Sequence, residues 1–142
     1  MIVKAPNKIL TNPCEILTKD NYRNILNKFI YKSVLHRKEG VGISGNQVGM
    51  PYSLFSIYKD NKFWVNMINP EIVQTFGKKI THYEGCLSIP GKEYLTERFT
   101  HIEIKYRNDK YNEQNEVLDG LNAIIFQHEH DHISGKLIGV KK

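Results

Sequence analysis

The sequence has only two cysteines, Cys14 and Cys86, and no long hydrophobic run. Two isolated cysteines do not make the disulfide framework of a small secreted domain. No apolar stretch reaches the roughly 20 residues needed to cross a bilayer, and residues 1–4 lead into no signal-peptide core. There is also no internal repeat, low-complexity tract or Pro/Ser-rich linker. We therefore predict a cytoplasmic protein with a single domain over residues 1–142, long enough to bury its own core.

The chain carries a modest excess of positive charge, with a formal net charge of +5 and a pI near 9.1. Such an excess can attract the phosphates of RNA. The lysines, however, are spread along the chain, and no RNA-binding motif accompanies them. This favours an ordinary solvated surface with no specific nucleic-acid partner. Weak association with ribosomal RNA is the alternative.

Residues 128–132 read His-Glu-His-Asp-His and contain the pattern H-E-x-x-H. On a helix, His128 and His132 lie four positions apart, so both imidazoles point the same way and can bind one metal ion. Glu129 is offset by about 100°, close enough to exchange a proton with metal-bound water. The histidines continue an apolar helical stripe formed by Leu121, Ile124 and Ile125. Both histidines should therefore face the interior, where a metal ion explains them better than the alternative of satisfied core histidines.

A catalytic zinc-type site needs a third protein ligand and an open position for water. The ten residues after His132 contain no His, Cys, Asp or Glu, so the third ligand is expected upstream. Cys86 is the best candidate, because the glycines and proline in 85–91 let the backbone turn tightly near an ion. Cys14 is expected to be a half-buried structural residue. Weaker ligand candidates are His82, Glu84 and His101.

Three segments occur in an order that is typical of one protein family. Residues 40–49 read GVGISGNQVG, residues 84–88 read EGCLS, and residues 127–132 read QHEHDH. Together they resemble the three motifs of peptide deformylase. Similarity also appears at 90–91, at Arg98 and in the alternating pattern around Ile104, so that it covers most of the chain. The joint match is far more specific than any one motif.

The resemblance implies a role for each matching residue. Cys86, His128 and His132 would bind one divalent metal ion, usually Fe(II), with Zn, Ni or Co as alternatives. Glu129 would be the general acid and base, and the Gln47 amide and the Leu87 backbone N–H would hold the developing oxyanion. The family removes the formyl group from the N-terminal formylmethionine of new polypeptides. The residues expected to bind the substrate are Val41, Gly42, Leu121, Ile124 and Ile125.

The sequence departs from the family pattern at two places. Ser44-Gly45 stands where the first motif usually has two alanines, and Asn46 often corresponds to proline or threonine. Only ten residues follow His132, as in short phage-encoded forms. We therefore do not expect docking on the ribosome through the C-terminal helix that bacterial forms use, and the expected setting is a bacterial or phage-infected cytoplasm.

Two other functions are compatible with a site of this kind. One is a metallopeptidase, which is disfavoured by the thiolate and by the lack of a downstream ligand. The other is a non-enzymatic binding module stabilised by metal. Glu129 argues against that module, because a structural site has four protein ligands and needs no carboxylate beside a water.

The periodicity predicts an α+β fold in which antiparallel strands surround a central helix with the H-E-x-x-H motif. A first helix is predicted over 19–37, ended by Gly40. Asp119 is a candidate N-cap and Gly135 a candidate stop for the motif helix. Residues 59–62 and 108–110 are expected to be turns. The predicted strands are 52–58, 63–69, 71–76, 99–106 and 114–118.

Overall fold

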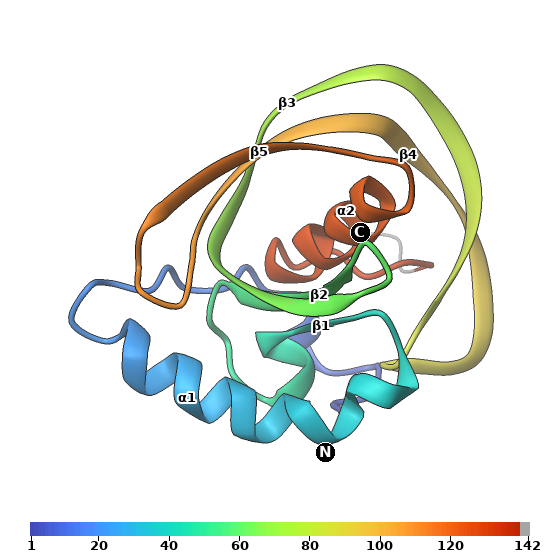
Figure 1. Ribbon diagram of the computed structural model, residues 1–142. Helices are drawn as coiled ribbons and strands as arrows, with labels where there is room; N and C mark the ends of the chain where they lie inside the picture. Colours follow the sequence, from blue (N-terminus) through green and yellow to red (C-terminus); the bar gives the residue numbers. More distant parts are fainter. Residues whose placement is uncertain (140–142) are drawn as a thin grey trace.

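The computed structural model describes residues 1–139, and it has an α+β fold in which a curved sheet surrounds one helix (Figure 1). The five strands follow the order β1-β2-β3-β4-β5, each antiparallel to the next. Their bounds are β1 Gly42–Ser44, β2 Leu54–Lys59, β3 Phe63–Cys86, β4 Ile89–Arg107 and β5 Glu113–Asp119. The helices are α1 Tyr22–Ser33 and α2 Gly120–Ile133, with short 3-10 turns η1 Lys8–Leu10, η2 Val34–Glu39 and η3 Gly45–Val48.

The long hairpin of β3 and β4 gives the sheet its curvature. The predicted strands 63–69 and 71–76 are parts of the single strand β3, and 99–106 is the end of the longer β4. The pairing of β3 with β4 shifts register between Ile68 and Glu71, and again between Phe76 and Lys79. Such irregularities bend a strand and increase its twist. They therefore let one continuous hairpin wrap around α2, where the sequence had indicated separate strands.

The turn predicted at 59–62 is confirmed as the connection between β2 and β3. Asp60 and Asn61 have φ angles of 55° and 54°, and the N–H of Lys62 donates to the carbonyl of Lys59. Asp and Asn tolerate this left-handed conformation better than most residues, which is why the pair suits a tight hairpin. The predicted strand 114–118 is also confirmed, as β5.

Helix α1 is shorter than the predicted helix over 19–37. Before it, Thr18 and Asn21 form a turn in which each backbone N–H donates to the other residue's side chain. After it, the chain tightens into η2. The buried apolar side chains of α1 end with Phe29: the next buried position on that face is the polar Ser33, and no apolar residue follows there. With no apolar side chain to bury, the α-helix ends.

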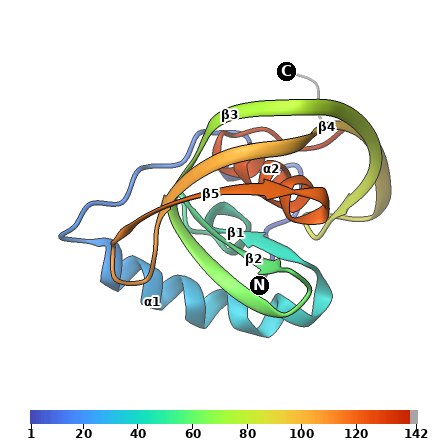
Figure 2. The same ribbon diagram turned by 45° about the horizontal axis from the view of Figure 1, so that its top comes forward.

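Helix α2 lies inside the sheet, and β1 and β2 lie between it and α1 in both ribbon views (Figures 1 and 2). One cluster of buried side chains joins α2 to the sheet, and a second joins α1 to β1 and β2. Gly135 ends α2 as predicted, with φ 80° and its N–H donating to the carbonyl of His132. Asp119 precedes α2 but makes no side-chain cap. Within residues 1–139, neither α-helix has the length and hydrophobicity of a membrane span.

Candidate metal centre and active site

The hairpin between β3 and β4 brings Cys86 to α2. Cys86 ends β3 and pairs with Ile89 across the turn, so it lies at the hairpin tip. On α2, the rings of His128 and His132 are neighbours, with centroids 5.0 Å apart. One ligand atom from each of the three residues lies within 4.8 Å of the others, and Cys86 Sγ is 3.3 Å from His132 Nε2. Among residues 1–139 this is the one cluster of three potential metal ligands.

The donor atoms of this cluster suit a divalent metal ion. Burial, followed by the positive charges of His128 and Arg98, lowers the pKa of His132 well below its usual value, so the ring is neutral and can donate a lone pair. Burial would also lower the pKa of His128, but hydrogen bonds with Cys86 and Glu84 outweigh it and raise the pKa to about 10. A bound ion would displace that proton. One thiolate and two imidazoles form a donor set that Zn(II) and Fe(II) accept.

A buried carboxylate orients one of the two histidines. Glu84 Oε1 is 2.8 Å from His128 Nδ1, which leaves Nε2 of that ring for an ion. Arg98 donates to both oxygens of Glu84, at 2.8 and 2.7 Å, and also to Asp131 Oδ2 at 2.6 Å. Burial opposes the charge on Glu84, but the bonds from Arg98 and His128 outweigh it and hold the pKa well below its usual range. Glu84 is therefore a positioning residue and does not join the ligand cluster.

The other weak ligand candidates also lie outside the cluster. His82 is 3.8 Å from Glu84 and lines the nearby cavity. His101 stacks on Phe76 on the sheet. Cys14 is half-buried as expected, and burial raises the pKa of its thiol to about 11.

Glu129 is 3% exposed and lies beside the cluster, with Oε2 4.0 Å from His128 Nε2. Burial raises the pKa of Glu129 to about 7, although the positive charges of His128 and Arg98 oppose that rise. Within residues 1–139 its Oε1 has no hydrogen-bond partner. A Cβ on Gly42 would lie 2.5 Å from Glu129 Oε2, so the glycine makes room for this carboxylate. The sequence predicted only a substrate contact for Gly42, because it gives no signal of the packing of Glu129 against this residue.

Gln47 lies in η3, opposite the hairpin tip. The Ser44 backbone N–H donates to Gln47 Oε1 at 3.1 Å, which turns the amide nitrogen towards Ser88 Oγ at 3.2 Å and Cys86 Sγ at 3.5 Å. Leu87 lies in the turn itself and lines the same cavity. The structure thus brings both expected oxyanion donors to the cluster.

Ser44 and Asn46, two residues that depart from the family's first motif, connect this part of the chain to α2 through hydrogen bonds. Ser44 Oγ donates to Asn46 Oδ1 at 2.6 Å, and Asn46 Nδ2 donates to the backbone carbonyl of His132 at 2.7 Å. Ser44 and Asn46 are fully buried, and His132 is 1% exposed. The sequence showed these substitutions but gave no signal of their partner, which is 86 positions away from Asn46.

A cavity of about 740 Å³ opens over Cys86, His128 and Glu129. All five residues expected to bind substrate line it: Val41, Gly42, Leu121, Ile124 and Ile125. Ile124 and Ile125 are buried, but Leu121 and Val41 are 55% and 47% exposed. Leu121 is exposed because α2 begins at the cavity mouth and its first turn faces solvent there.

Comparison with known proteins identifies the family. The profile of the family described as polypeptide deformylase matches residues 1–141. The chain belongs to this family. It is 37% identical to the peptide deformylase of Aquifex aeolicus over 94% of this chain and 82% of that protein. It is 35% identical to the peptide deformylase of Karelsulcia muelleri over 96% and 74%.

Solved deformylase structures have the same fold. The crystal structure of the Thermotoga maritima peptide deformylase aligns with a TM-score of 0.86 and 31% identity, over 97% of this chain and 93% of that one. An inhibitor complex of the Plasmodium falciparum peptide deformylase aligns with a TM-score of 0.83 and 32% identity, over 96% and 85%. The protein is therefore a metal-dependent deformylase with an α+β fold, and its family uses a single divalent metal ion.

Proposed function

We propose that this chain, as a single catalytic domain, removes the formyl group from N-formylmethionyl peptides with a metal ion held by Cys86, His128 and His132. The observation that carries the proposal is the convergence of these ligand atoms within 4.8 Å beside a buried carboxylate. A purely structural site would have four protein ligands and no need for Glu129.

An ion held by Cys86, His128 and His132 would act as a Lewis acid and would lower the pKa of water in the site towards neutral pH. Glu129 accepts the proton of the attacking water and delivers it to the leaving amine nitrogen, a role that its pKa near 7 suits. The Gln47 amide nitrogen and the Leu87 backbone N–H donate to the oxygen that becomes negative on the formyl carbon. The C–N bond breaks, and the products are formate and a free N-terminal amine.

The methionine side chain of the substrate enters the apolar part of the cavity. Ile124 and Ile125 form its buried wall, and Val41 and Leu121 form its mouth. An unbranched thioether fits such a wall with little polar desolvation. Gly42 has no side chain, so the substrate backbone can pass close to this edge of the cavity.

We propose Fe(II) as the native ion, with Zn, Ni or Co as able replacements, because a thiolate and two imidazoles suit all of these metals. The reaction acts on new chains, so the proposed setting is the cytoplasm of a bacterium or of a phage-infected cell. Weak association with ribosomes is part of the same proposal.

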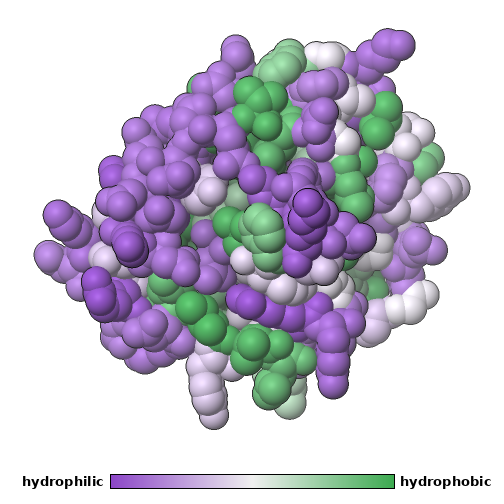
Figure 3. Space-filling model, viewed as in Figure 1, coloured by the Kyte–Doolittle hydropathy of each residue, from purple (hydrophilic) through white to green (hydrophobic). Residues whose placement is uncertain are grey.

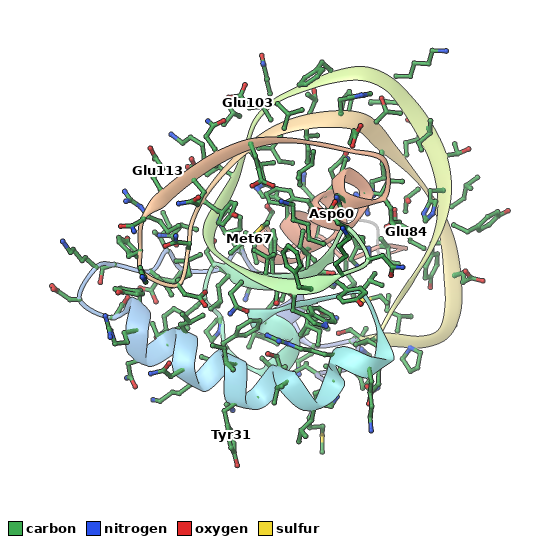
Figure 4. All side chains as sticks on the ribbon, in the orientation of Figure 1. Tyr31, Asp60, Met67, Glu84, Glu103 and Glu113 are labelled. Atoms are coloured by element: carbon green, nitrogen blue, oxygen red, sulfur yellow. The ribbon has the colours of Figure 1, made fainter. Side chains whose placement is uncertain are left out.

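The test is formate release from formyl-Met-Ala-Ser by protein purified anaerobically with Fe(II) or Ni(II). Glu129→Gln should retain the metal and lose turnover by about 10²- to 10⁴-fold, because it cannot accept the proton. Cys86→Ala should lose the metal. Glu113→Gln, on exposed β5 away from Glu84 in Figure 4, is the matched control and should behave as wild type. Full turnover by Glu129→Gln, or full metal occupancy in Cys86→Ala, would overturn the assigned roles.

A further inference from the structure

One segment of the chain has basic residues without any acidic residue to balance them. Residues 22–38, which form α1 and most of η2, contain five basic residues and no acidic one. These five charges equal the net charge of the whole chain, so the rest holds 15 basic and 15 acidic residues. Asp20 and Glu39 flank the segment. The basic residues are Arg23, Lys28, Lys32, Arg37 and Lys38.

Lys28, Lys32 and Lys38 make no side-chain hydrogen bond within residues 1–139 and can meet an external partner, whereas Arg23 donates to the Tyr22 hydroxyl and Arg37 donates to Asn66 Oδ1. Arg23, Lys28, Lys32 and Lys38 are exposed, and none of the five forms an ion pair with another residue in 1–139. Arg37 is half-buried, with its guanidinium 5.2 Å from the Trp64 ring centre. Lys28 and Lys32 lie four positions apart on α1, so their like charges repel each other, and an anionic partner relieves that repulsion.

The same face presents groups that contact nucleotides. Tyr31 is 80% exposed and points away from the body of the protein (Figure 4). Asn24 and Asn27 are exposed between it and Arg23. Aromatic rings stack on unpaired bases, and amides hydrogen-bond to bases and sugars. Along the lower edge of Figure 3, where α1 and η2 run, hydrophobic and hydrophilic side chains lie side by side.

A membrane surface fits this face less well. A helix that lies in a bilayer interface needs a continuous apolar face to insert. The apolar stripe of α1, with Ile25, Leu26 and Phe29, is buried against the protein core. The outer face offers only Tyr31 and the nearby Val34 and Leu35.

We propose that the outer face of α1 and η2 is a docking surface for RNA, bound through its phosphates by the basic side chains and through stacking on Tyr31. The proposal rests on the proposed function, because a formylated nascent chain emerges from the RNA-rich ribosome. The segment is followed directly by Glu39, which lines the active-site cavity together with Gly40 and Val41. RNA bound here would therefore lie beside the cavity mouth.

The test measures binding of a fluorescein-labelled RNA hairpin to the metal-loaded protein by fluorescence anisotropy at several salt concentrations. The triple variant Arg23→Gln, Lys28→Gln, Lys32→Gln should bind at least roughly tenfold more weakly, and the slope of log affinity against log salt should fall by about 2. Tyr31→Ala should weaken binding roughly fivefold without changing that slope.

The matched control is Lys62→Gln, Lys78→Gln, Lys110→Gln. These three lysines are exposed, form no ion pair within residues 1–139, and give the same change in net charge. The control should retain affinity within about twofold. Equal losses in both triple variants, no measurable RNA binding, or tighter binding to anionic lipid vesicles through the same residues would each overturn the proposal. Formate release from formyl-Met-Ala-Ser, measured for every variant, reports separately on the proposed function.

Discussion

Gly42→Ala should separate catalysis from folding at this active site. The new Cβ would lie 2.5 Å from Glu129 Oε2, where ordinary contact begins at 3.4 Å. The carboxylate must therefore move by about 0.9 Å, and a misplacement of about 1 Å at a reacting group costs about 100-fold in rate. That loss corresponds to about 2.7 kcal/mol in the activation barrier.

Stability should change little in the same variant. The backbone of Gly42 needs no left-handed conformation, and the atoms that must give way, Oε2, Cδ and Cγ of Glu129, belong to a side chain and not to the backbone. Replacing glycine also reduces the entropy of the unfolded chain, worth about 0.4–1 kcal/mol in favour of the folded state. We expect a change in the free energy of unfolding within about 1 kcal/mol and full metal occupancy.

The assay compares kcat for formyl-Met-Ala-Ser with metal content and thermal unfolding. Gly40→Ala is the control, because its Cβ would meet Leu87 no closer than 3.7 Å. It should keep kcat within about threefold of wild type, with any change confined to KM. Wild-type kcat in Gly42→Ala, or a loss that follows loss of metal or fold, would refute the reasoning.

Three further outcomes follow from the contacts around the site. Glu84→Gln removes the buried carboxylate that binds Arg98 and leaves that guanidinium with only Asp131 as an anionic partner. Thermal unfolding should show a loss of about 3 kcal/mol, and chelator competition should show a metal affinity weaker by about 10- to 100-fold. Asn46→Asp replaces a donor to the His132 carbonyl with an acceptor; the melting temperature should fall by roughly 10 °C, and an unchanged melting temperature would contradict the role of Asn46. Because burial raises the pKa of Cys14 to about 11, its thiol should react slowly with iodoacetamide at pH 8 and faster as the pH rises. Mass spectrometry measures the alkylation, and rapid alkylation of Cys14 in the folded protein would contradict its burial.

The sequence predicted elements well where the signal is local. The H-E-x-x-H helix, the turn at 59–62 and the strand at 114–118 follow from spacing and turn residues within a few positions. The predictions were less accurate where tertiary contacts determine the bounds of an element. The predicted helix over 19–37 is longer than α1, because the spacing of apolar residues does not show where the helix stops packing against the core.

What the sequence by itself determined is the family and the groups proposed for the site: a thiol, two imidazoles four positions apart and an adjacent carboxylate. These are residue identities and local spacings, which a helix converts into geometry without further information. Only the tertiary structure decided that Cys86 lies at a hairpin tip against α2, that Glu84 orients His128, and that Asn46 holds the carbonyl of His132. Those partners are 40 or more positions apart in the chain, and they meet because β3 and β4 bend around the core.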